Sequence, residues 1–353
     1  MRDDEEMSDA TPHPSTDDQV EAPAPGSQDW LDLVHEDVVD PEVPVVDPHH
    51  HLWPEGGALP YGLAELEADV GSGHRIEATV FVECGAAYRP SGPAHLRPVG
   101  ETEFVSAQAA RASRPLIAGI VARADLRLGD ELDEVLDAHE AAGQGLFRGI
   151  RHALAHAEHP EELRIPGGSP AGLFADPAFQ VGLARLGQRG LTYDTWHYHY
   201  QLPEFGELAR AVPDTVMVLD HFGTPLGVGR YAGRREEIFE QWRHDIAEVA
   251  RCENVVAKLG GLAMPDNGFG WDLAERPPTS DDLVAAQRRY YEHAIECFGP
   301  DRCMLESNFP VDRFSLSYRV LWNALKKLVA PYSLDERTAM LAGTARRVYR
   351  LDH

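Results

Sequence analysis

The stretch DPHHH at residues 47–51 follows the apolar run VPVV at residues 43–46, which is typical of a β-strand. His49 and His51 are two residues apart, and side chains on an extended strand alternate between its faces, so both imidazoles point to the same side. Two neutral imidazoles on one side are suitable ligands for zinc or a similar divalent ion. A histidine cluster at a strand end can also be a solvated loop, or can hydrogen-bond to the core without a metal. The rest of the chain has to distinguish these interpretations.

Further apolar runs follow this first one at regular intervals along the chain. Most are continuous and rich in β-branched residues, which is typical of strands that are buried on both faces of a parallel sheet. The eight expected strands are Val43–Asp47, Ala78–Glu83, Leu116–Ala122, Phe147–Arg151, Leu191–Asp194, Thr215–Leu219, Val255–Leu259 and Cys303–Leu305.

Helical patterns alternate with these strands. The clearest are Asp130–Ala142, Asp176–Arg189, Arg234–Cys252 and Ser280–Phe298, and a last helix begins at Ser333 with the capping box SLDE. Alternating strands and helices indicate βαβ units with right-handed crossovers. Eight such units predict an α/β fold of the (β/α)8 TIM-barrel type. A doubly wound open sheet is the alternative, but no Gly-rich phosphate turn follows the first strand.

Residues 1–28 differ in composition from the rest of the chain. They are rich in Asp, Glu, Pro and Ser and nearly free of large apolar residues. Such a segment cannot bury enough apolar surface to offset the entropy lost on ordering, so we expect a disordered acidic tail. From Trp30 onward the composition is globular and no second linker divides the chain, which predicts a single domain over residues 29–353.

The charge and cysteine content restrict the partners and the compartment. The chain has 353 residues and a formal net charge of −26, which argues against binding to nucleic acids or to anionic membranes. No apolar run approaches the roughly 20 residues of a membrane span, and the acidic N-terminus does not resemble a secretory signal. The four cysteines lack C-x-x-C spacing and are expected to be reduced thiols. We therefore expect a cytoplasmic protein, and the sequence leaves a homo-oligomer open.

Polar residues close almost every expected strand. In an eight-stranded barrel the catalytic groups lie at the carboxyl ends of the strands, so these residues predict a polar pocket at the barrel mouth. The strand-end residues are Asp47, His49, His51, Glu83, Arg148, Arg151, His152, Asp194, Trp196, His197, His199, Asp220, His221, Lys258, Glu306, Asn308 and Asp312. Five stretches that follow strands (52–75, 84–100, 152–175, 222–233 and 260–279) exceed the usual βα loop of about 2–6 residues, which indicates lids over a small-molecule site.

Three motifs occur in order at these strand ends: D-x-H-x-H at residues 47–51, LDHFGTP at 219–225 and ESNFP at 306–310. Together they resemble the amidohydrolase superfamily, and most closely its amidohydrolase-related branch, which includes sugar-acid lactonases and the pyrone-dicarboxylate lactonase. The resemblance covers residues 43–351. It implies a distorted (β/α)8 hydrolase with its active site at the C-terminal face of the barrel.

Carried over residue by residue, the resemblance implies that His49 and His51 bind the metal and that His221 is catalytic. Asn308 stands where most members carry an aspartate that binds the metal or moves the proton, and an amide is a poor base and a weaker ligand. Glu306, or Glu83 from the second strand, is expected to supply the missing carboxylate. Asp312 is a further candidate for this role.

The fourth strand bears on the number of metal ions. Members with two ions carry a carboxylated lysine there, whereas this chain has Arg148, Arg151 and His152, and its Lys258 is on the seventh strand. The resemblance therefore implies one divalent ion, with zinc as first choice. Some lactonases of this branch work without a metal, which leaves metal-independent action open.

Several residues are candidates for binding a small-molecule substrate. Arg148 and Arg151, interpreted as lying on one face of the fourth strand, suit an anionic substrate through bidentate contacts to a carboxylate. They could instead form structural ion pairs. His197, His199 and Trp53 are expected to line the pocket, although an aromatic side chain in a loop often belongs to the loop's own core.

The sequence thus predicts a hydrolase of a small, carboxylated organic molecule, with opening of a lactone by metal-assisted attack of water as first choice. Amide hydrolysis and non-oxidative decarboxylation, which also occur in the wider superfamily, are the alternatives within the enzyme class. A barrel that binds a small acid without turnover is the alternative outside it, and Asn308 keeps that alternative open.

Overall fold

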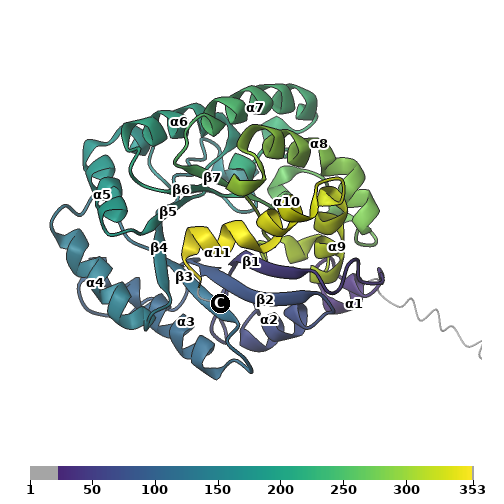
Figure 1. Cartoon of the computed structure of the whole chain (residues 1–353), viewed down its shortest axis with the longest axis horizontal. Coiled ribbons are helices and arrows are strands. Elements are labelled where there is room, and N and C mark those ends of the chain that lie inside the picture. Colours follow the sequence, from purple (N-terminus) through teal and green to yellow (C-terminus); the bar gives the residue numbers. More distant parts are fainter. Residues whose placement is uncertain (1–22, 352–353) are drawn as a thin grey trace, which may run out of the picture.

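The computed structural model describes residues 23–351, which form a barrel of parallel strands surrounded by helices (Figure 1). Its strands are β1 (Pro44–His50), β2 (Arg75–Val82), β3 (Ile117–Ala122), β4 (Phe147–Arg151), β5 (Thr192–Thr195), β6 (Met217–Leu219), β7 (Val255–Leu259) and β8 (Cys303–Leu305). They lie in sequence order, and each strand is parallel to the next. Beyond β8, Phe309 pairs with His50 of β1. The predicted (β/α)8 TIM barrel is therefore confirmed, with each expected strand present.

Helices precede, separate and follow the strands along the chain. They are α1 (Gln28–Leu31), α2 (Leu63–Val70), α3 (Val99–Arg111), α4 (Glu131–Gly143), α5 (Pro177–Gln188), α6 (Leu202–Ala211), α7 (Arg235–Ala250), α8 (Ser280–Phe298), α9 (Tyr318–Val329), α10 (Leu334–Thr338) and α11 (Thr344–Tyr349). The predictions for α4, α5, α7 and α8 are confirmed to within a few residues. Ser333 caps α10, as its motif predicts.

The prediction of one long loop over residues 52–75 is wrong in its second half, because α2 lies there. The carboxylate of Glu65 accepts a hydrogen bond from the N–H of Gly62 and so helps to start this helix. Leu66 and Val70, one turn apart, are buried against the barrel. A helix of two turns with two buried residues gives too weak a periodic signal to separate it from a loop by sequence.

The interior of the barrel is apolar at the amino-terminal ends of the strands. Valines of several strands, among them Val46, Val218 and Val256, form one buried cluster with Met304 and with residues of the C-terminal segment that includes α11. Figure 1 shows α11 (yellow) in front of the strands at the centre of the view. This end of the barrel is therefore filled and leaves the opposite end for a site.

One pleat further along the same strands, the inward-facing positions become charged. Side chains on a strand alternate with a period of two, so Asp220, Lys258 and Glu306 point the same way as Val218, Val256 and Met304. The side chains of these three charged residues are fully buried. The barrel interior thus changes from an apolar layer to a charged layer toward its C-terminal face.

The expected tail over residues 1–28 lies outside the described residues, apart from 23–28. In that part, the hydroxyl of Ser27 caps α1. Trp30 of α1 is fully buried, and its indole N–H donates to the carbonyl of Ala274. None of the helices that the structure describes is long and apolar enough to cross a membrane.

Candidate active site

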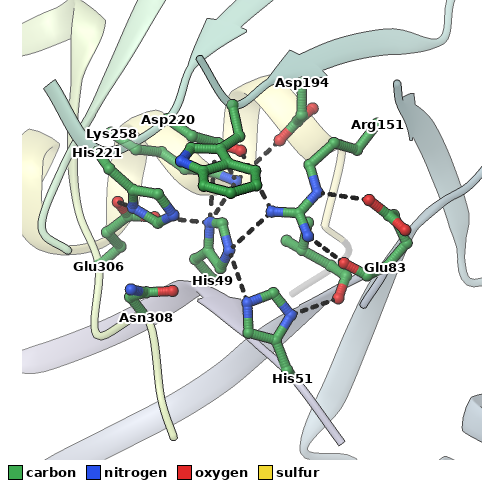
Figure 2. A network of polar contacts seen from close by, with 12 residues as sticks. His49, His51, Glu83, Arg151, Asp194, Asp220, His221, Lys258, Glu306 and Asn308 are labelled. Carbon is green, nitrogen blue, oxygen red and sulfur yellow. Dashed lines mark hydrogen bonds and ion pairs between the residues drawn. The ribbon is translucent and has the colours of Figure 1, made fainter. Parts of the chain in front are cut away.

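His49 and His51 face each other at the C-terminal end of β1 (Figure 2). Their Nε2 atoms are 3.2 Å apart, as the same-face prediction requires. Nδ1 of His51 lies 2.8 Å from the carbonyl oxygen of Val82, which can only accept, so that nitrogen carries the proton. Nδ1 of His49 lies 2.9 Å from Oε2 of Glu306 and donates to it in the same way. Both Nε2 atoms therefore present lone pairs.

Two lone pairs at this separation repel each other unless a cation lies between them. With zinc–nitrogen bonds of about 2.0–2.1 Å, two ligands of a tetrahedral site are about 3.3 Å apart, close to the separation seen here. Burial lowers the pKa of both His49 and His51 well below the usual value, and the charges of Lys258 and Arg151 lower it further, so both imidazoles are neutral. The pair therefore fits a divalent metal ion.

Glu306 joins this pair to His221. Its Oε1 accepts from Nδ1 of His221 at 2.7 Å, and its Oε2 accepts from His49. Burial alone would raise the pKa of Glu306, but the two imidazoles lower it to about 2, so it is a carboxylate throughout the neutral range. His49, His221 and Glu306 each place a ligand atom within 4.8 Å of the others, so this buried group is a candidate metal centre.

Two glycines that directly follow β7 make room for these side chains. A Cβ atom on Gly260 would lie 2.4 Å from Cγ of Glu306, and one on Gly261 would lie 2.3 Å from Nδ1 of His221. Gly261 also has a φ of +72°, which glycine adopts without strain. His221 itself has a φ of +53°, which is costly for a residue with a Cβ and is typical of functional sites.

A second layer of buried charge lies beneath the histidines. Nζ of Lys258 is 2.8 Å from Asp194 and 3.2 Å from Asp220, and all three side chains are fully buried. Asp220 lies 3.7 Å from both His49 and Arg151. The sequence places Asp194 and Lys258 among the polar strand ends but assigns neither of them a catalytic, substrate-binding or metal-binding role. Their shared inward face could have revealed this layer, because they align with Arg151, Asp220 and Glu306 in the pleat.

A cavity of about 360 Å³ opens above this layer. Six of the predicted site residues line it: His51, Trp53, Glu83, Arg151, His221 and Asn308. His49 and Glu306 are fully buried and lie below the floor. The strand-end interpretation therefore brought together residues of five strands at one pocket, and residues of the long loops, including Ile165 and Met264, form its walls.

Arg151 is held by Glu83 rather than presented freely to a ligand. Its Nε donates to Oε1 of Glu83 at 2.9 Å, and its Nη2 donates to the carbonyl oxygen of Glu83. Its Nη1 lies 3.5 Å from Nε2 of His49, at the long limit for a hydrogen bond. A bidentate contact to a substrate carboxylate would therefore require the Glu83 side chain to move.

The prediction that Arg148 shares a face with Arg151 is wrong. Their positions on β4 are three apart, and an odd spacing places side chains on opposite faces of a strand. The guanidinium of Arg148 donates to the carbonyl oxygens of Gly145 (2.6 Å) and Ala118 (3.3 Å), before the strand reaches the pocket. The structure places it away from the cavity.

The structure also places His197 and His199 outside the cavity. His197 is fully buried between the rings of Phe174 and Phe205. His199 begins a short helical turn, and its Nδ1 accepts from the N–H of Leu226. The chain leaves the strand after Thr195, so the alternation of a strand no longer applies there, and Trp196 lines the cavity instead.

Asn308 lines the cavity in a left-handed conformation, with a φ of +55°. Its Nδ2 donates to Oδ1 of Asp312 at 2.9 Å, so its carbonyl oxygen points the other way, toward the histidine pair (Figure 2). Asp312 is fully buried, and burial raises its pKa to about 7 although His221 and the hydrogen bonds from Asn308 and Ala263 oppose the shift. Asp312 thus fixes which end of the amide faces the cavity.

The substitution D312N tests the raised pKa of the Asp312 carboxyl. In the unfolded chain Asp312 loses its proton near pH 3.8, and in the folded chain near pH 7. The folded state binds more protons between these values, so the wild type loses stability relative to D312N as the pH rises from about 4 to 7, and the difference then levels off. Urea denaturation of both proteins at several pH values measures this. A difference that does not vary with pH contradicts the raised pKa.

The family model for amidohydrolases matches residues 46–351. Protein y4mH of Sinorhizobium fredii is 31% identical to this chain over 331 residues, which are 88% of this chain and 99% of y4mH. The L-fucono-1,5-lactonase of Burkholderia multivorans is 27% identical over 322 residues, which are 87% of this chain and 96% of the lactonase.

A crystal structure with bound zinc is also similar to this chain. It is an amidohydrolase from Burkholderia multivorans, 26% identical, which covers 87% of this chain and 99% of its own with a TM-score of 0.66. The family match and the relative at 31% identity both span the strands that carry the histidines, Glu306 and Asn308. This chain therefore belongs to the amidohydrolase family and is a hydrolase built on a (β/α)8 barrel.

Proposed function

We propose that this enzyme opens a lactone ring by hydrolysis, with one zinc ion held by His49 and His51. The observation that carries the proposal is the pair of Nε2 atoms 3.2 Å apart, beside His221 and at the floor of an open pocket. The L-fucono-1,5-lactonase at 27% identity supports a cyclic ester, and the zinc-bound relative supports the metal. A zinc ion in such a site supplies Lewis acidity toward a carbonyl and lowers the pKa of bound water.

His221 is the proton-transferring group in this proposal. Its Nδ1–H donates to Glu306 at 2.7 Å, so its Nε2 is free to accept a proton. Its side chain lines the cavity, where a water molecule and an ester can meet it. The carboxylate of Glu306 fixes the tautomer and stabilises the imidazolium that forms, as a carboxylate does beside a catalytic histidine.

Arg151 and Asn308 complete the polar floor. Nη1 of Arg151 points toward Nε2 of His49, so it can donate to an oxyanion that develops on a substrate carbonyl beside the histidines. The carbonyl oxygen of Asn308 faces the same space and can accept from a water molecule, but as an amide it cannot take up a proton. The base of this chain is therefore His221 with Glu306. No carboxylate on the substrate is required, because Arg148 lies elsewhere and Glu83 holds Arg151.

Metal removal tests the proposal. Treatment with a chelator, followed by its removal, should lower the hydrolysis of lactones by about 100-fold or more, since metal ions stabilise such transition states by several kcal/mol. Adding one equivalent of zinc should restore the activity. The assay is a pH-indicator measurement over a panel of lactones, with an amide panel and carbon dioxide release as parallel readouts. Full activity in metal-free protein overturns the metal role, and activity only on amides or acids overturns the lactone assignment.

A further inference from the structure

The cavity has a polar floor and apolar walls. We propose that the substrate carries its reacting ester on an apolar ring system of one or two fused rings, and that polyhydroxylated sugar lactones are poor substrates. This inference rests on the proposed lactone hydrolysis and specifies the molecule that undergoes it. It departs from what the name of the fucono-lactonase relative suggests.

The side chains of the walls are mostly apolar. They are formed by Trp53, Ile165, Trp196, Met264 and Val311, which come from different loops above the barrel. The indole N–H of Trp196 donates to the hydroxyl of Thr224 at 3.1 Å, so this ring meets the cavity without its polar group. Side chains from several separate loops thus converge on one mostly apolar cavity.

The polar groups of the cavity gather at the floor, and most of their hydrogen-bonding capacity is used within the protein. Nδ1 of His51 donates to Val82, and Glu83 pairs with Arg151. Likewise, Nδ1 of His221 is bound to Glu306, and Nδ2 of Asn308 is bound to Asp312. The groups that remain open, such as Nε2 of His221 and the carbonyl oxygen of Asn308, lie together at the floor beside the histidine pair, where the reacting ester and its water would be.

A sugar lactone would bury several hydroxyl groups against these walls. Each hydroxyl gives up hydrogen bonds to water on entering, and without a partner in the protein that loss opposes binding. An aromatic or aliphatic ring gains from the same walls, because it leaves water for an apolar surface. The cavity volume of about 360 Å³ lies at the lower end of the range for ligand pockets, which limits the substrate to a small ring system.

Two δ-lactones with contrasting bodies test the inference. Dihydrocoumarin carries its ester on a fused benzene ring, and D-glucono-1,5-lactone carries hydroxyls on the same size of lactone ring. With zinc-loaded protein, kcat/KM for dihydrocoumarin should exceed that for the sugar lactone by at least about tenfold, the scale of discrimination by an apolar pocket. Equal or faster turnover of the sugar lactone overturns the inference while the lactonase function stands.

Wall variants show whether the preference comes from this cavity. V311T replaces a methyl group by a hydroxyl with little change of shape, and M264Q introduces an amide of similar length. Each should lower the ratio of the two kcat/KM values several-fold, toward the sugar lactone. V181T is the matched control, because Val181 lies on α5 with 60% of its surface exposed, and its ratio should stay within about twofold of the wild type. An unchanged ratio in both wall variants contradicts the inference.

A binding measurement separates this inference from the function on which it rests. 2-Tetralone has the framework of dihydrocoumarin with a carbonyl but no ester, and 1,5-anhydro-D-glucitol is a ring polyol without the ester. If neither lactone is hydrolysed, the lactonase proposal fails. Calorimetry then decides the present inference: binding of 2-tetralone but not of the polyol supports an apolar ligand, whereas binding of the polyol alone, or of neither, overturns it.

Discussion

After incubation with zinc and removal of the excess, the H49A and H51A proteins are expected to hold no bound metal and to retain less than about one-thousandth of the wild-type kcat/KM toward lactones. Each variant removes one of two Nε2 atoms that lie 3.2 Å apart with their lone pairs facing. A thousandfold loss corresponds to about 4 kcal/mol of transition-state stabilisation, which is within the several kcal/mol that a metal ion supplies. Metal content from elemental analysis and steady-state kinetics on the same samples check both parts of the expectation.

His50 provides the matched control between these two histidines. It points to the other face of β1, where its Nε2 lies 3.0 Å from the hydroxyl of Thr79 and its ring packs near Phe81. Because it is fully buried, H50Q is expected to lower stability, but it should keep the metal and most of the activity. Wild-type turnover in both H49A and H51A would contradict the proposed chemistry. Loss of the metal in H50Q but not in H49A or H51A would contradict the assignment of His49 and His51 as ligands.

The sequence revealed the barrel because its signals are local and repeat eight times. Each buried parallel strand is a short apolar run, and polar residues close the runs at the face where barrels carry their sites. His49, His221 and Glu306 were found in this way, and the structure brings them into one cluster, with His51 3.2 Å from His49. The spacing of two residues within a strand was enough to predict that the two histidines face each other.

The wrong predictions at the site come from the alternation of side chains along a strand, which was either misapplied or did not hold. Arg148 is an odd number of positions from Arg151, so the strand period itself excluded it from the pocket. His197 and His199 follow the end of β5, where a helical turn replaces the strand. Which end of the Asn308 amide faces the cavity depends on Asp312 across a left-handed turn, and no periodicity predicts such a contact.

The sequence names the residues of the charged layer beneath the site but does not predict that they pair with one another. The resemblance says only that Lys258, on the seventh strand, does not bridge two metal ions. Applying the two-residue period from Val256 places it inside the barrel, level with Asp220 and Glu306. A lysine in the centre of a barrel needs carboxylates close by, since a charged group is rarely buried without a partner. Asp194 and Asp220 are those partners.

The substitution K258M is expected to destabilise the protein by about 3–5 kcal/mol, which is a large part of the stability of an ordinary domain. Methionine has a similar length but no charge. Burial alone would lower the pKa of Lys258, but Asp194 and Asp220 raise it, so the ammonium is charged and compensates both carboxylates. Without it these carboxylates remain in the barrel interior, with the hydroxyls of Tyr349 and Thr192 and the more distant Arg151 as partners. Urea denaturation followed by circular dichroism measures the loss.

K327M is the matched control at the surface. Nζ of Lys327 lies 2.6 Å from Asp281, whose side chain is 81% exposed, and 2.7 Å from the hydroxyl of Ser280, which keeps Glu36 as a partner, so the expected cost is below about 1 kcal/mol. The double variant K258M/D194N should recover part of the lost stability, because it removes one of the two carboxylates that K258M leaves without a cation. A K258M protein as stable as K327M would mean that Asp194 and Asp220 are protonated or hydrated without the lysine. In that case the protein would avoid buried uncompensated charge by protonating or hydrating these carboxylates, and the ion pairs with Lys258 would not be needed for stability.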